Sequence, residues 1–149
     1  MSAALDMILA EPSFAERIDM SRIMAAGFSF GGWTALSLGG ATGNHAGSVE
    51  TCATYTDMAA CGMLMSENVN LPGVDPEIWN ASYADARITH AVAIDPGFVW
   101  GLEEANVAEL LPATLVIGFG GEGDRMLATD FDRSWLSSHL GDRKIKRFD

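Results

Sequence analysis

The stretch RIMAAGFSFGGWTALSL, residues 22–38, joins an apolar run to a segment of small residues through a turn that holds one serine. The apolar run, residues 23–28, is typical of a strand buried on both faces of a sheet. Residues 32–38 have a helix-like composition. A strand, a tight turn and a helix in this order are the repeating unit of α/β folds. The stretch therefore predicts an α/β unit with Ser29 at its turn.

The turn itself matches the pattern G-x-S-x-G, with Gly27 and Gly31 on either side of Ser29. In this context the pattern predicts a nucleophile elbow, whose turn is so sharp that both glycine positions must lack side chains, and Gly32 adds further room. The strained turn lifts the serine hydroxyl clear of the sheet and directs the amide of Phe30 toward an oxyanion. The alternative is a glycine-rich turn whose serine only caps the helix. A phosphate-binding loop is excluded, because it needs a lysine that this segment lacks.

Strand-like and helix-like segments alternate along the rest of the chain, and residues 41–88 are predicted to be an insertion of loops and short helices. This alternation predicts parallel strands with right-handed crossovers. We therefore expect one α/β domain, residues 1–149, with a parallel sheet, flanking helices and its site at the carboxyl ends of the strands. The predicted strands are residues 23–28, 90–95, 114–118 and 144–148, and the predicted helices are one that ends near residue 10 and those at residues 32–38, 103–111 and 129–140.

The composition narrows the class of protein. With 149 residues, 48% of them hydrophobic and 19% charged, the chain is typical of one soluble globular domain. It has no apolar run of about 20 residues, so no membrane span is expected. Residues 1–10 lack the basic region of a signal peptide, and no targeting segment indicates a compartment. The net charge of -11 disfavours binding to phosphate backbones, so nucleic acid is not an expected partner.

The two cysteines, Cys52 and Cys61, lie close together in the loop-rich segment. No C-x-x-C pair and no neighbouring histidine accompany them, so neither a zinc site nor any other cofactor is expected. Two alternatives stay open: a pair of reduced thiols, or a small disulfide loop in an exported protein.

Three segments carry a resemblance to a known family: RIMAAGFSFGGWTALSLGGATG at residues 22–43, DARITHAVAIDPG at 85–97 and LPATLVIGFGGEGDR at 111–125. Together they resemble the α/β-hydrolases, in particular the dienelactone-hydrolase-like esterases that include relatives of platelet-activating-factor acetylhydrolase. The resemblance covers most of the chain and implies a partial α/β-hydrolase core. It also implies a serine esterase or lactonase that acts on small carboxylic esters or lactones by a Ser-His-Asp mechanism.

The chain order of this superfamily, serine then acid then histidine, maps the acid onto Asp124. The residues lead to the same position, because Asp124 follows the third predicted strand in a glycine-rich turn. Asp95, which ends the neighbouring strand and is fixed by Pro96, is the alternative acid. If one imidazole bridges Asp124 and Ser29, the hydroxyl and the carboxylate should lie roughly 6–9 Å apart.

None of the three histidines is well placed to activate the serine. His90 opens a strand at the opposite edge of the sheet, His45 follows the helix that leads away from the elbow, and His139 ends a helix running about 15–18 Å back from it. The resemblance places the catalytic histidine just beyond Asp149. We therefore expect the 149-residue chain alone to have little activity, and the edge of its first sheet strand to pair with itself or another chain.

Trp33, Phe98 and Trp100 follow strand ends and are candidates for an acyl or alkyl pocket or, equally, for the core. Two other functions remain as alternatives. The missing histidine favours a non-catalytic interaction module with a hydrolase fold. Residues 118–123 match G-x-G-x-x-G, which favours a dinucleotide-binding domain, although Glu122 would then face the pyrophosphate.

Overall fold

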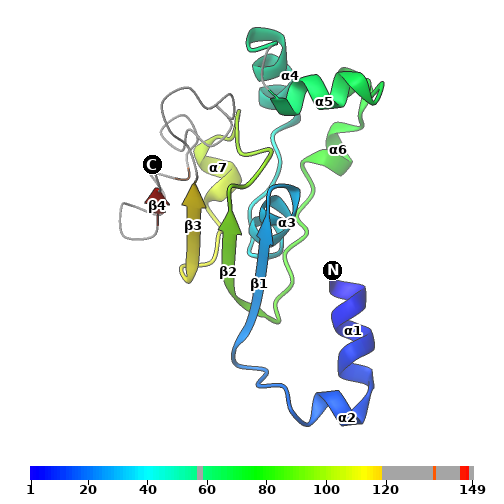
Figure 1. Ribbon diagram of the computed structural model, residues 1–149, viewed down its shortest axis with the longest axis vertical. Coiled ribbons are helices and arrows are strands. Elements are labelled where there is room, and N and C mark those ends of the chain that lie inside the picture. Colours follow the sequence, from blue (N-terminus) through cyan, green and yellow to red (C-terminus); the bar gives the residue numbers. More distant parts are fainter. Residues whose placement is uncertain (57–58, 119–135, 137–144, 148–149) are drawn as a thin grey trace.

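The protein is an α/β fold built on a four-stranded parallel sheet (Figure 1). The computed structural model describes residues 1–56, 59–118, 136 and 145–147. Each neighbouring pair of strands is parallel, so the predicted fold class, a parallel sheet with flanking helices, is confirmed. The strands, in spatial order, are β1 (Ile23–Phe28), β2 (Ile88–Ile94), β3 (Thr114–Gly118) and β4 (Ile145–Arg147).

The helices follow the expected alternation, with one clear difference in length. The last described helix stops at Val107 rather than near residue 111, because the chain turns and the amide of Leu111 donates to the carbonyl of Gly39 at 2.8 Å. The predicted helix at 129–140 lies outside the described residues, apart from Leu136. The described helices are α1 (Ser2–Ala10), α2 (Pro12–Ala15), α3 (Phe30–Leu38), α4 (His45–Thr54), α5 (Ala59–Ser66), the 3-10 turn η1 (Leu71–Gly73), α6 (Pro76–Trp79) and α7 (Glu104–Val107).

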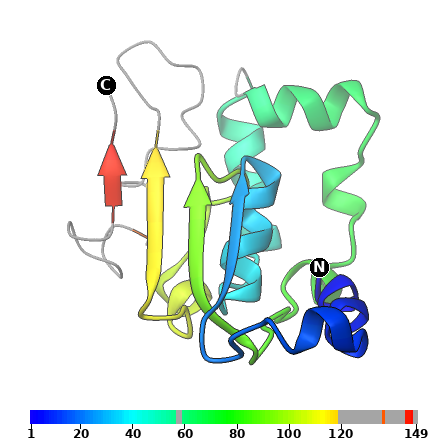
Figure 2. The ribbon, with the colours of Figure 1, turned by 60° about the horizontal axis from the view of Figure 1, so that its bottom comes forward.

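Two described helices that connect strands, α3 and α7, lie on one face of the sheet (Figure 2). The strand order advances in one direction, and right-handed crossovers then place each connecting helix on the same side. Figure 2 shows α3 and α7 together behind the strands. This face carries the main core, which joins α3, the strands and the segment around α7. Its buried members include Leu36, Ala93, Val99, Val107, Val116 and Leu136.

The opposite face of β1 is open, in contrast to the expectation of a strand buried on both faces. Met24 is 58% exposed and Phe28 is 59% exposed, whereas Ala25, which points to the α3 side, is buried. The physical reason is that β1 is the edge strand and that no helix of the described residues lies over this face (Figure 2). The apolar composition of the strand therefore overstates its burial.

Residues 45–79 form the short helices α4, α5, η1 and α6, and α4 and α5 lie beyond the carboxyl ends of β1 and β2 (Figure 1). A disulfide between Cys52 and Cys61 joins α4 to α5, so the two cysteines are paired with each other and are not a pair of reduced thiols. Within the described part of the chain, no helix has the length and apolar character needed to cross a membrane.

Candidate active site

Ser29 occupies a strained turn between β1 and α3, as the elbow hypothesis requires. Its backbone has φ 54° and ψ -119°, a combination that a residue with a side chain rarely adopts. Three hydrogen bonds hold it there. The Ser29 amide donates to the Ile94 carbonyl at 2.9 Å, and the Ser29 carbonyl accepts from the amides of Trp33 and Gly97, each at 3.1 Å. The turn is therefore fixed from both the helix and the neighbouring strand.

Of the three glycines near Ser29, two are positions where a Cβ would lie close to neighbouring backbone, as expected, and one is not. A Cβ added to Gly27 would overlap the backbone of Gly31, so the position must be glycine. A Cβ on Gly32 would lie 3.0 Å from the Cα of Pro96. In contrast, a Cβ on Gly31 would meet no atom within 4 Å. The expectation that Gly31 must lack a side chain is therefore wrong: it is the backbone of Gly31 that comes close, not its side-chain position.

Phe30 begins α3, and its amide belongs to the first turn of that helix. Amides of a first turn have no acceptor within their own helix, and they carry the positive end of the helix dipole. The carbonyl of Phe30 is already engaged, since it accepts from the Thr34 hydroxyl at 3.0 Å. The structure thus places a backbone donor directly after Ser29, where an oxyanion donor is expected.

Strained backbone conformations cluster at this end of the sheet. Asp95, directly after β2, has φ 44°, and Phe98, three residues later, has φ 58°. The Asp95 amide donates to the Ile117 carbonyl at 2.6 Å, and Gly97 bonds to Ser29. The loop after β2 is therefore tied to β3 on one side and to the elbow on the other. Such strain is typical of functional sites, where the surrounding structure imposes it.

Four aromatic side chains form an aromatic wall beside the elbow: Phe30, Trp79, Phe98 and Trp100. The ring of Phe98 stacks on Phe30 with centroids 4.8 Å apart. It also meets Trp79 edge-on at 5.5 Å and Trp100 at 5.3 Å. The predicted pocket residues Phe98 and Trp100 thus belong to this wall. Trp33 does not: its ring packs against the main core and lines a groove with Met1 and Tyr83.

Trp79 is a member of the wall that the sequence does not indicate. It lies in α6, fifty positions from Ser29, and it joins the wall through its edge-on contact with Phe98. No motif marks it, and a tryptophan in a loop-rich segment has many possible neighbours. Phe30 is similar, because the elbow pattern assigns a role to its amide but none to its ring.

The structure describes only one of the two candidate acids, Asp95. Asp95 is buried at the carboxyl end of β2, on the loop that bonds to Ser29, so its position suits the alternative acid. Asp124, the preferred acid, lies outside the described residues, and its distance from Ser29 stays a prediction. So do the roles of residues 119–123 in the G-x-G-x-x-G pattern.

Neither described histidine contacts the elbow. The Nε2 of His45 lies 2.8 Å from the Leu71 carbonyl, and the ring packs edge-on against Trp79 at 5.9 Å. His90 lies early in β2 opposite Met24, far down the strand from Ser29, and its Nδ1 is 2.9 Å from the hydroxyl of Thr89. His139 lies outside the described residues.

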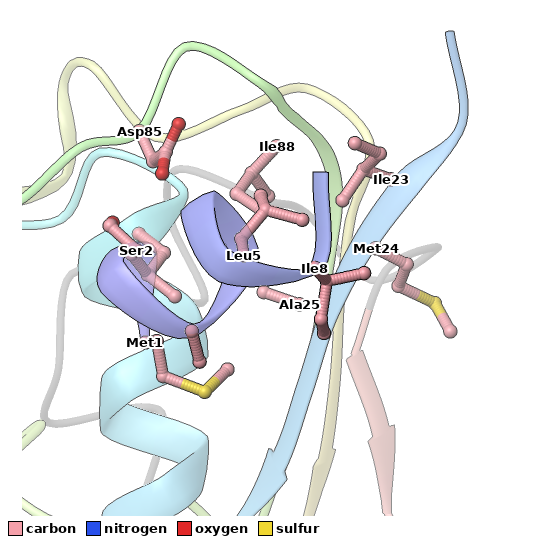
Figure 3. Close-up of a pocket in the computed structure, with 11 residues that line it drawn as sticks. Met1, Ser2, Leu5, Ile8, Ile23, Met24, Ala25, Asp85 and Ile88 are labelled. Atoms are coloured by element: carbon pink, nitrogen blue, oxygen red, sulfur yellow. The ribbon is translucent and has the colours of Figure 1, made fainter. Parts of the chain in front are cut away.

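A groove lies at the other end of β1, between that strand and α1 (Figure 3). It encloses about 180 Å³ and is lined mainly by apolar side chains, among them Leu5, Ile23 and Ile88. Its one carboxylate, Asp85, is held by Arg87, and these hydrogen bonds keep the pKa of Asp85 well below its usual range. The groove therefore offers apolar packing but no reactive group.

The comparisons with known proteins add no assignment: no family model, no curated protein and no solved structure matches this chain. Among the residues that the structure describes, no group of three or more His, Cys, Asp or Glu side chains is arranged to hold a metal ion.

Proposed function

We propose that the protein is a serine hydrolase that acts on carboxylic esters or lactones through Ser29. The observation that carries the proposal is the backbone of Ser29, held at φ 54° and ψ -119° between a parallel strand and a helix. A glycine-rich turn with a capping serine needs no such strain. It would also use the hydroxyl to cap α3, and the Ser29 side chain makes no cap hydrogen bond to this helix.

In the proposed reaction the Ser29 hydroxyl attacks the carbonyl carbon of the ester. An imidazole takes the serine proton and later returns it to the leaving alcohol, and an aspartate orients the imidazole. The amide of Phe30 donates to the oxyanion that forms, and the aromatic wall contacts the acyl or alkyl group. We assign the aspartate to Asp124, with Asp95 as the alternative. Neither His45 nor His90 supplies this imidazole, because both are engaged away from Ser29.

A non-catalytic interaction module remains the second candidate, and a specific observation favours it. Within residues 1–56 and 59–118, both histidines are engaged away from the elbow, so no base is in place beside Ser29. The open face and edge of β1, with Met24 and Phe28 exposed, suit self-association, which analytical ultracentrifugation would detect as a concentration-dependent mass.

The deciding experiment is labelling with a fluorophosphonate probe, followed by mass-spectrometric mapping of the modified residue. We expect the phosphonate on Ser29, no adduct in Ser29→Ala, and an unchanged adduct in the matched control Ser82→Ala, an exposed serine in the segment between α6 and β2. Added imidazole should accelerate the labelling, because no described histidine reaches the serine. No adduct on Ser29 with or without imidazole would favour the interaction module.

A further inference from the structure

The disulfide lies against the aromatic wall. Cys61 is 1% exposed and Trp100 is 5% exposed, and the two form one buried cluster. Cys52 and Phe98, which are half-buried, pack against the same cluster. The bridge between α4 and α5 therefore forms part of the support on which Phe98 and Trp100 rest.

A second contact joins α4 to the loop that carries these aromatics. The side-chain amide of Asn44, which caps α4, donates to the Gly101 carbonyl at 2.7 Å and accepts from the Gly47 amide at 3.1 Å. Gly47 and Gly101 approach so closely that a Cβ on either one would overlap the backbone of the other. The start of α4 and the loop at residues 97–101 are thus fixed to each other.

The same loop is fixed to the elbow at its other end. The amide of Gly97 donates to the Ser29 carbonyl, and Phe98 stacks on Phe30. A Cβ on Gly97 would lie 3.0 Å from the Phe30 ring, so the loop and the first turn of α3 are in direct contact. A continuous set of packed groups therefore runs from the disulfide to the serine.

We propose that the Cys52–Cys61 disulfide is a redox-sensitive positioning device for the site, and that a dithiol reductant slows the reaction at Ser29 by releasing the aromatic wall. The proposal rests on the proposed function, since it concerns the regulation of the same serine. Without the bridge, α5 loses its covalent link to α4, and Trp100 and Phe98 lose one side of their support.

The chemistry is ordinary thiol–disulfide exchange. Cys61 is buried and Cys52 is half-buried, so a reductant thiolate reaches the Cys52 sulfur first. Its attack forms a mixed disulfide with Cys52 and breaks the bond to Cys61, whose sulfur leaves with the electron pair and takes up a proton. The second thiol of the reductant then attacks the mixed disulfide. It releases Cys52 as a thiol and leaves the reductant as a disulfide, so two electrons and two protons pass to the protein.

The test compares the oxidised protein with protein that has been reduced by dithiothreitol and then alkylated. Mass spectrometry verifies that both cysteines carry the alkyl group. Hydrogen–deuterium exchange reports the loop directly. We expect faster exchange of the amides at residues 97–101 after reduction and unchanged protection of β2. Fluorophosphonate labelling of Ser29 should slow on the order of 10- to 100-fold, the scale of a displacement near 1 Å at a reacting group. The variant Cys52→Ser, which retains the buried Cys61 sulfur, should behave like the reduced protein with or without dithiothreitol.

Two outcomes separate this proposal from the proposed function. Identical exchange at residues 97–101 in the oxidised and fully alkylated proteins would overturn the positioning role, whatever the labelling shows. A loop that responds to reduction while Ser29 is unlabelled in both states would support the positioning role and count against the hydrolase. If Cys52→Ser does not fold, the reduced wild-type protein still gives the same comparison.

Discussion

The two ends of the parallel sheet differ in their backbone conformations and in whether their polar groups are paired. Among the residues that the structure describes, four non-glycine residues have positive φ, and three of them lie at the carboxyl end: Ser29, Asp95 and Phe98. At the amino end of the sheet the register of β1 on β2 shifts between Ile23 and Met24, and a groove of about 180 Å³ separates α1 from β1. The charged groups at that groove bind each other, with Arg87 between Asp6 and Asp85.

This difference teaches that open space is a poor guide to function in this protein. The groove beside α1 is hollow, but its lining is mainly apolar and its one carboxylate, Asp85, is paired with Arg87. The carboxyl end stores strain, which costs about 1–3 kcal/mol at each such residue and persists only where neighbouring structure imposes it. A hydroxyl and a helix-terminal amide are presented there side by side. Chemistry is therefore expected at the strained end.

The largest effect should come from Ser29→Ala. If the carboxyl end is a hydrolase site, this change removes the nucleophile, and the turnover of a short p-nitrophenyl ester by protein supplied with imidazole should fall to the rate measured with imidazole alone. Circular dichroism should show the sheet intact. Ester turnover that survives in Ser29→Ala would mean that another group performs the reaction.

The next effect concerns the stability of the turn. Gly27→Ala places a methyl group on the backbone of Gly31, and we expect the free energy of unfolding to fall by about 2–4 kcal/mol. The matched control is Gly31→Ala, whose methyl group meets open space within α3 and should raise the same free energy by about 0.5–1 kcal/mol. Urea titrations of both variants give the comparison. Equal destabilisation by the two changes would refute the close approach seen at Gly27.

The elbow could be predicted because it is a local pattern. The steric needs of a strand-to-helix turn act over a few residues, so G-x-S-x-G between an apolar strand and a helix identifies both the fold class and Ser29. The alternation of strands and helices likewise predicts the parallel order. Gly31 shows the limit of this reasoning. The pattern does not reveal that the missing side chain matters at Gly27, where a Cβ would meet the Gly31 backbone, and not at Gly31 itself.

Only part of the aromatic wall could be predicted: Phe98 and Trp100 follow a strand end, whereas Trp79 joins them through a contact between distant segments. Trp79 contacts Phe98, and the disulfide packs against Trp100 and Phe98, although these groups come from segments far apart in the sequence. The open face of β1 was missed for a related reason. An apolar strand sequence reports what the strand can bury, whereas its exposure depends on its place in the sheet, and β1 lies at an edge.

A smaller effect on the free energy of unfolding is expected from removing the disulfide at the carboxyl end. The bridge closes a loop with a sequence separation of 9, and in the chain-entropy model its loss should lower the free energy of unfolding by about 2–3 kcal/mol. Urea titrations of the wild type and Cys52→Ser measure this loss. The matched change Ala53→Ser, at the exposed neighbouring position, should have little effect. A Cys52→Ser protein as stable as the wild type would show that the bridge does not constrain the unfolded chain.

The smallest expected effect lies at the amino end, where charges are paired rather than presented. The hydrogen bonds from Arg87 lower the pKa of Asp85 in the folded protein, so the carboxylate stabilises the fold above its unfolded pKa of about 4 and ceases to do so as the pH falls through the lower, folded value.

A double-mutant cycle with Asp85→Asn and Arg87→Met should give a coupling energy of up to about 1 kcal/mol near neutral pH, since Arg87 is partly exposed. This coupling should persist at about pH 4 and shrink in stronger acid, because only the charged carboxylate accepts both hydrogen bonds from Arg87 fully. A coupling that is absent near neutral pH, or that does not change with acid, would mean that the Asp85–Arg87 pair does not stabilise the amino end of the sheet. The contrast between the two ends would then rest on backbone strain alone.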